Sequence, residues 1–295
     1  MEAIAHEMRV SRSSVSRLLG FARESGLVEV TIRSPQEDTG RLQGAIHQRY
    51  GVAVHIVPIP DHTSDIDRLD RVALSAARML GQFLDSSMTV GIAWGSTLSA
   101  VSRHLVPHPL HDVKFVQLNG AGNTRTTGIV YASEILRRFA DAYTATSEQF
   151  PVPAFFDDAA TKAALWKERG TRRILELQKR ADLAIMSLGS PFAVVPSHVY
   201  IGGYLDREDY AALRTERVVG DAATVFYRAD GSHRDIPINT RASGPDLDAL
   251  RRVPRRVVIV SGVSKLASLR GALAAGLITD LIIDEGMARA LTAAP

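Results

Sequence analysis

The fold is most clearly specified by residues 89–97, Thr-Val-Gly-Ile-Ala-Trp-Gly-Ser-Thr. The first six of these residues are mostly apolar and predict a buried strand. Residues 96–105 follow as a helix with Leu98 and Val101 on one face, and Gly95 allows a tight turn between the two elements. A buried strand that turns through a glycine into a helix is typical of an α/β protein.

The same alternation continues along the rest of the chain. Strands are predicted at 52–57, 89–94, 113–118, 181–188, 223–227, 257–261 and 281–283, and helices at 69–80, 96–105, 131–142, 160–180, 265–275 and 285–291. Because the strands are almost continuously apolar, we expect a parallel sheet with helices on both faces. This α/β domain is predicted to cover residues 51–295, after a linker helix at 35–50 whose start is polar and contains proline and glycine.

Composition narrows the class of protein. The chain has 295 residues and no cysteine, which excludes disulfides, Cys-ligated zinc and cysteine nucleophiles. Its net charge of +3 permits anionic partners without proving one. No secretory signal is recognisable, and glycines and prolines interrupt the uncharged stretch 183–205, so we expect a cytoplasmic protein without a membrane span.

Residues 1–34 have the pattern of a helix-turn-helix followed by a wing. A short helix around Ile4 is followed by a second helix with Val15, Leu18, Leu19 and Ala22 on its buried face, and by an alternating strand at 27–32. Ser11 or Ser13 can cap the second helix. Its outward face would present the residues that we expect to contact DNA, namely Arg12, Ser13, Ser14, Ser16 and Arg17. The alternative is an ordinary amphipathic helix pair.

The helix-turn-helix is expected to be truncated. Such a unit usually needs a third helix to close its core, and three residues precede Ile4. Either the sequence starts inside the domain or this copy of the DNA-binding unit is impaired.

Taken together, the motifs resemble the SorC-type family of sugar-binding transcriptional regulators. The resemblance rests on VSRSSVSRLLGFARESGLVEVTI, VGIAWGSTLSAV, VQLNGAGN, SLGSP, VVGD and VVIVSGVSKLASLRGALAAGLITDLIIDEGMARALT, in that order along the chain. It implies a winged DNA-binding unit and a Rossmann-like effector domain, related to sugar-phosphate deaminases and isomerases. It also implies a sugar or sugar-phosphate effector and a homo-oligomer, either a dimer or a tetramer.

The strongest candidate for the effector site is the turn at Gly95, Ser96 and Thr97. A glycine turn that opens a helix presents free backbone N–H groups at a positive helix end, which suits an anion. The resemblance places an effector phosphate here. The alternative is a plain strand–helix turn that Ser96 caps.

Further candidates follow other strands. Asn119 and Gly120 lie in a loop after a predicted strand, where open α/β sheets bind ligands, although such a loop also suits ordinary turns. Lys265 follows the strand at 257–261 and could reach a phosphate or sugar oxygen, while the common alternative is a surface lysine. By resemblance, Asp221 would hold sugar hydroxyls. For Asp284, helix capping is the preferred reading.

Three functions remain open at this point. The first is a ligand-responsive transcription factor that binds operator DNA and a sugar, with no cofactor. The second is a sugar-phosphate isomerase or deaminase on the same fold, which is disfavoured because no acid–base pair is evident in the strand-end loops. The third is an effector-binding protein that has lost DNA binding. A metal site at His104, His108 and His111 is not expected, because Pro107 and Pro109 break the helix that would align them.

Overall fold

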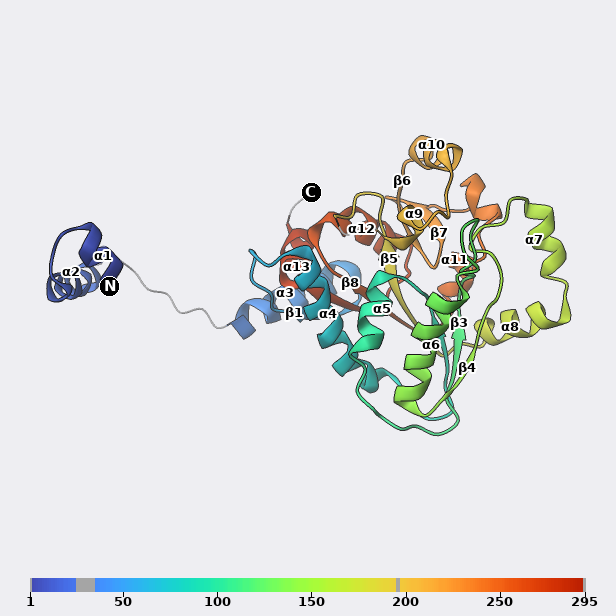
Figure 1. The fold of residues 1–295 in the computed structure, drawn as a ribbon, viewed down its shortest axis with the longest axis horizontal. Helices are drawn as coiled ribbons and strands as arrows, with labels where there is room; N and C mark the ends of the chain where they lie inside the picture. Colours follow the sequence, from blue (N-terminus) through green and yellow to red (C-terminus); the bar gives the residue numbers. More distant parts are fainter. Residues whose placement is uncertain (1, 25–34, 195–196, 294–295) are drawn as a thin grey trace. The chain divides into compact units, whose positions relative to one another are not determined.

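The computed structural model describes residues 2–24, 35–194 and 197–293. The chain divides into two compact units, Met1–Asp38 and Thr39–Pro295, which are described separately (Figure 1).

The first unit contains two helices, α1 (Glu2–Glu7) and α2 (Arg12–Glu24). The backbone N–H of Ser14 donates to Ser11 Oγ over 3.1 Å, so of the two capping residues that the sequence allowed, Ser11 caps α2. Ala5 and Val15 are buried between the helices. The predicted wing at 27–32 lies outside the described residues.

The buried face predicted for α2 is only partly formed. Leu18 is 54% exposed, so for this residue the prediction is wrong. The physical reason is that two short helices enclose very little volume, so the outer part of an apolar face needs a further element to cover it.

The second unit is built on a parallel sheet of seven strands. In spatial order these are β1 (Ala53–Val57), β9 (Asp280–Asp284), β8 (Arg255–Val260), β5 (Leu183–Gly189), β2 (Thr89–Ile92), β3 (Lys114–Gln117) and β4 (Thr146–Glu148). An antiparallel hairpin, β6 (Val218–Ala222) and β7 (Val225–Arg228), extends from the end of β5.

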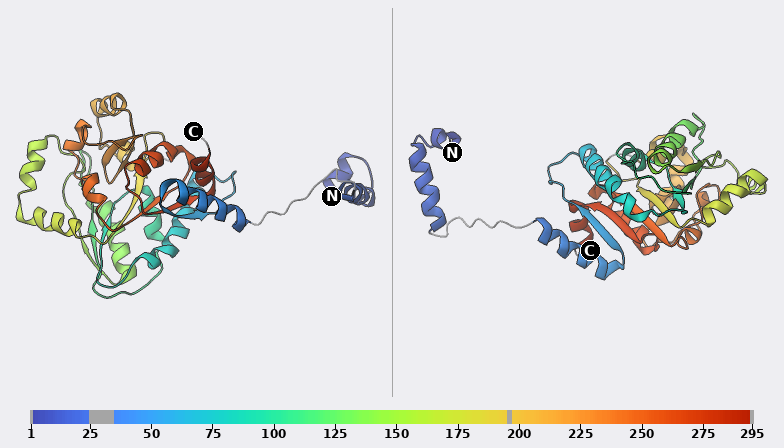
Figure 2. Two further views of the ribbon diagram at one scale, coloured as in Figure 1. Left: turned by 180° about the vertical axis from the view of Figure 1, so that it is seen from behind. Right: turned by 90° about the horizontal axis from the view of Figure 1, so that it is seen from below.

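Helices cover both faces of this sheet (Figures 1 and 2). One face packs against α4 (Asp65–Leu80), α5 (Ser96–Arg103) and α6 (Ile129–Tyr143). The other packs against α3 (Pro35–Tyr50), α8 (Arg169–Lys179), α11 (Leu247–Leu250), α12 (Leu266–Ala274) and α13 (Glu285–Thr292). Successive residues of β5 alternate between the two cores, with Ile185 in one and Met186 in the other.

The α/β pattern predicted from the sequence is confirmed, with local corrections. The long helix predicted at 160–180 is two helices, α7 (Ala159–Leu165) and α8. The strand predicted at 223–227 is displaced, because Ala223 and Thr224 have positive φ and form the turn between β6 and β7. Two further short helices, α9 (His198–Ile201) and α10 (Arg207–Thr215), connect β5 to β6.

The strand order changes direction at the centre of the sheet. From β2 the chain moves outward to β3 and β4, and then returns to place β5 on the other side of β2. At such a switch point neighbouring loops diverge and leave a crevice at the carboxyl ends of the strands. Among the described residues, no helix combines the length and apolar character that crossing a membrane requires.

Candidate functional site

Loops from four strands meet at the switch point and enclose a small polar cavity. Most of the residues predicted to bind an effector line it, although they come from distant parts of the chain: Gly95, Ser96, Thr97, Asn119, Asp221 and Lys265. The sheet brings them together because β2, β3, β5 and β8 are near neighbours that run in the same direction.

The bend before α5 presents backbone amides to this cavity. Gly95 has φ 158° and ψ 168°, a conformation that is essentially restricted to glycine, and no side chain caps the helix that follows. The first N–H groups of a helix have no partner inside the helix. Thr97 is buried, and its Oγ1 accepts a hydrogen bond from Ser187 Oγ over 3.0 Å, which fixes the side chain. The bend is therefore suited to an anionic group.

Asn119 supplies a buried hydrogen-bond acceptor just after the carboxyl end of the neighbouring strand β3. Its backbone oxygen accepts from Trp94 Nε1 over 3.1 Å and from Gln117 Nε2 over 2.7 Å, so the main chain is held firmly. Its side-chain Oδ1 is buried and has no hydrogen-bond partner among the described residues. A buried polar atom without a partner is costly, so this oxygen is suited to receive a ligand hydroxyl.

Asp221 and Lys265 place two ionisable groups in the cavity wall. Burial raises the pKa of Asp221 to about 6, an effect that hydrogen bonds from the Thr224 backbone and the Tyr200 hydroxyl oppose. Its Oδ1 has no partner that satisfies hydrogen-bond geometry among the described residues. Burial lowers the pKa of Lys265 to about 8 against the attraction of Asp221, and Nζ donates to Leu188 O over 3.1 Å.

Gly120 lies away from this cavity. A side chain here would collide with the backbone oxygens of Val152 and Pro153, at 2.3 and 2.4 Å from an added Cβ. The Gly120 N–H donates to Ser243 Oγ over 2.9 Å. The glycine therefore allows two loops to approach closely, and its predicted contact with an effector stays a prediction.

Several lining residues were not singled out from the sequence. They are Trp94, Ser187, Leu188, Gly189, Ser197, His198, Val199, Ala223 and Thr224. Trp94 is next to the glycine bend, so its position along the sequence could have indicated it. His198 comes from the connection between β5 and β6, and no local pattern marks it.

The cavity is narrow. It has a volume of about 30 Å³, and an adjoining cavity of about 10 Å³ shares Ser96, Thr97 and Lys265 with it. A space of this size holds a water molecule but not a sugar.

The N-terminal unit presents most of its predicted DNA-contacting side chains to solvent. Arg12, Ser13, Ser16 and Arg17 are exposed, whereas Ser14 is half-buried and its hydroxyl is 2.9 Å from Ser11 Oγ. Arg12 also forms an ion pair with Glu2 on α1. The exposed surface of α2 thus carries small hydroxyl and arginine side chains together with the apolar side chains of Leu18 and Phe21.

These features define a class of protein. A doubly covered parallel sheet with a polar cavity at its switch point is a small-molecule binding domain, and a separate unit presents a serine- and arginine-rich helix. The Sugar-bind family model, which describes a sugar-binding domain, matches residues 34–293. The chain belongs to this family of sugar-binding transcriptional regulators.

Curated relatives extend over almost the whole chain. The deoxyribonucleoside regulator of Bacillus subtilis is 31% identical over 98% of this chain and 91% of its own length. The erythritol catabolism regulatory protein EryD of Brucella abortus is 24% identical over 99% of this chain and 92% of its own length. The chain is thus a transcription regulator with a sugar-binding domain.

Solved structures support the same assignment. A domain of a possible sugar-binding transcriptional regulator from Arthrobacter aurescens TC1 is 53% identical, covers 88% of this chain and all of its own, and superimposes with a TM-score of 0.82. The full-length sorbitol operon regulator SorC from Klebsiella pneumoniae is 21% identical, covers 99% of this chain and 93% of its own, and has a TM-score of 0.78. The second likeness shows the fold alone.

Proposed function

We propose that the Thr39–Pro295 unit binds a sugar phosphate in the cavity at the switch point, and that this binding controls operator recognition by the N-terminal unit. The observation that carries the proposal is the chemical asymmetry of the cavity. The Gly95 bend and Lys265 supply hydrogen-bond donors and positive charge, while Asn119 Oδ1 and Asp221 Oδ1 are buried acceptors to which no described residue donates with hydrogen-bond geometry. A phosphate suits the first set and sugar hydroxyls suit the second.

The names of the relatives agree with a small effector that carries hydroxyl groups. They refer to deoxyribonucleosides, sorbitol and erythritol, which are all small molecules with at least two hydroxyl groups. In the proposed complex the phosphate lies against the amides of Ser96 and Thr97, and Lys265 neutralises part of its charge. The sugar hydroxyls donate to Asn119 and Asp221.

For DNA, we propose that α2 enters the major groove of duplex operator DNA. Its exposed face would provide base-edge and phosphate contacts through Arg12, Ser13, Ser14, Ser16 and Arg17. Helix-turn-helix readers normally work as symmetric pairs with a fixed half-site spacing, so the acting species is a homo-oligomer, a dimer or a tetramer. A sugar that changes how subunits pack would change that spacing and therefore the affinity for DNA.

The protein is proposed to act without catalysis. The relatives are named as regulators. An isomerase or deaminase needs a base beside the sugar carbonyl and an acid for the oxygen. Turnover of a sugar phosphate by the purified chain would refute this part of the proposal.

The decisive experiment measures ligand response and DNA binding in the same preparations. Thermal unfolding is followed with phosphorylated and free pentoses, hexoses and polyols, and binding to the protein's own upstream DNA is followed by gel shift. A ligand at about 100 times its Kd stabilises the fold by about 2.7 kcal/mol, so the effector is recognised by a raised Tm.

Two variants separate the two activities. Lys265→Met should remove the preference for phosphorylated over free sugar and leave DNA binding intact. Arg17→Ala should weaken DNA binding and leave the ligand-induced rise in Tm unchanged. If each variant lost both activities equally, the division of labour between the two units would be wrong.

A further inference from the structure

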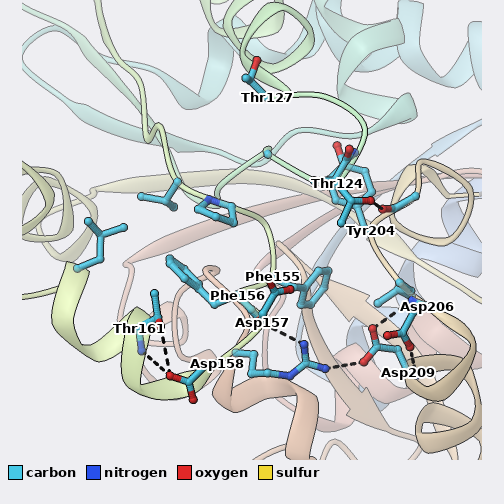
Figure 3. Close-up of a pocket in the computed structure, with 18 of the residues that line it drawn as sticks. Thr124, Thr127, Phe155, Phe156, Asp157, Asp158, Thr161, Tyr204, Asp206 and Asp209 are labelled. Atoms are coloured by element: carbon cyan, nitrogen blue, oxygen red, sulfur yellow. Dashed lines mark hydrogen bonds and ion pairs between the residues drawn. The ribbon is translucent and has the colours of Figure 1, made fainter.

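A second and much larger cavity lies beside the switch-point site. It has a volume of about 770 Å³, within the range of small-molecule sites. The loops that follow β3 and β4, the helix α7 and the start of α10 surround it (Figure 3). None of the residues proposed to bind the sugar lines this cavity.

Its lining combines hydrocarbon surface with oxygen atoms. The hydrocarbon part comes from Pro151, Pro153, Phe155, Leu165 and Leu205. Hydroxyl oxygens come from Thr124, Thr127 and Thr161. A ligand with an aliphatic central part and polar ends would match both kinds of surface.

The charged residues in the lining indicate that the ligand is positively charged. Asp157, Asp158, Asp206 and Asp209 all line the cavity, whereas Arg241 is the single basic residue in its lining. Arg241 is already engaged, because Nη1 donates to Phe156 O over 3.0 Å and Nη2 pairs with Asp209 Oδ1 over 2.5 Å. Among the described residues the other three carboxylates, which are exposed, form no ion pair, although Asp158 and Asp206 accept backbone N–H groups as the N-caps of α7 and α10. With four aspartates and one arginine in its lining, the cavity carries a net negative charge, which attracts cations.

The spacing of these carboxylates argues against a metal ion. Figure 3 shows Asp158 beside Thr161 on one side of the cavity, and Asp206 with Asp209 on the other. Among the described residues, the one group of three or more acidic or histidine side chains close enough to share an ion is His233, Asp246 and Asp248, none of which lines this cavity. Carboxylates that are separated by apolar side chains suit an extended organic molecule with several positively charged groups along its length.

We propose that this cavity binds an aliphatic polyamine or a similar extended organic cation. Ammonium groups would lie against Asp157 and Asp158 on one side and Asp206 on the other. The methylene groups between them would cover the prolines and leucines. The assignment concerns a site separate from the sugar cavity and goes beyond the proposed regulator function.

The two cavities share one aromatic wall, which provides a spectroscopic readout. Tyr204 lines the large cavity and stacks on Trp94 of the sugar cavity, with ring centroids 5.1 Å apart. Phe156, also in the lining, lies edge-on to Trp166 at 5.5 Å. These are the two tryptophans of the chain, so a guest in the cavity should alter the intrinsic fluorescence.

The test titrates the intact protein with spermidine by calorimetry and tryptophan fluorescence, at constant ionic strength. We expect saturable binding of one spermidine per chain. Asp157→Asn should weaken it about two- to fivefold, and the double variant D157N/D206N should weaken it further, because each lost ion pair is worth up to about 1 kcal/mol. The matched control is Asp85→Asn, an exposed aspartate outside the cavity, which should bind as the parent does.

Three results would overturn the assignment. They are no saturable binding at millimolar spermidine, equal losses in D157N and D85N, or equally tight binding of Mg²⁺ at the same site. The sugar-induced rise in Tm should persist in D157N. The rise in Tm with a sugar reports on the sugar cavity alone, and spermidine binding reports on the large cavity alone. Failure of one proposal can therefore be told from failure of the other.

Discussion

At the scale of single residues, Gly95 adopts a backbone conformation that other amino acids cannot adopt without strain. Its backbone conformation of φ 158° and ψ 168° strains any L side chain, although an added Cβ would meet nothing within 4 Å. The glycine is therefore required by backbone geometry and not by crowding. It leaves the start of α5 open to the cavity.

Asp221 leads to a prediction about pH. Its pKa in the folded chain, about 6, lies above the ordinary value of 3.8, so the folded state binds this proton more tightly than the unfolded state. Between about pH 4 and pH 6 the folded chain holds the extra proton, and its free energy of unfolding should fall as pH rises through that window. The contribution of this buried group is at most about 3 kcal/mol.

The measurement is urea unfolding of the parent and of Asp221→Asn at about pH 4.5 and about pH 7. The asparagine does not ionise, so the variant should lose less stability than the parent between the two values. An identical change in both proteins would show that the carboxylate does not titrate in this window.

At the scale of elements, Asp284 joins four segments. Its Oδ1 accepts from Arg68 Nη1 of α4 over 3.1 Å and from the Met287 N–H over 3.0 Å, and its Oδ2 accepts from the Gly262 N–H over 2.7 Å. Asp284 therefore caps α13 as predicted from the sequence. It also holds α4 and the loop after β8 at the end of β9, which local sequence does not reveal.

We expect Asp284→Ala to lower the free energy of unfolding by about 3–5 kcal/mol, because it leaves the buried guanidinium of Arg68 without its carboxylate. The control is Asp61→Ala, which removes the exposed partner of Arg289 and should cost less than about 1 kcal/mol. Urea midpoints measure both. A loss for D284A as small as that for D61A would mean that capping is its whole contribution.

At the scale of the whole molecule, the two units are predicted to work separately. The apolar core of the second unit is complete within Thr39–Pro295, and the similar Arthrobacter aurescens structure is a domain alone. A fragment of residues 39–295 should fold and give the same sugar-induced rise in Tm as the full chain, without binding operator DNA. Thermal shift and gel shift measure this, and a fragment without a sugar response would contradict it.

The sequence by itself determined the α/β class, most strands and helices, and the bend at Gly95, and it narrowed the cap of α2 to Ser11 or Ser13. These features are local: apolar runs, helical periodicity and glycine or capping residues act over a few neighbouring positions. The family resemblance then indicated Asp221 and Lys265 as well, and the structure places both in the same cavity as the bend.

Only the tertiary structure decided which of these residues meet. It placed β5 between β2 and β8, which brought Ser187 and Lys265 to the bend, and it left the buried Asn119 Oδ1 without a hydrogen-bond partner in the described part of the chain. In the tertiary structure Gly120 lies at a close contact between two loops, Leu18 is exposed, and a second cavity lies between α7 and α10. All of these depend on contacts between residues far apart in the chain. Strand order and side-chain burial are set by packing of the whole sheet, which no short stretch of sequence encodes.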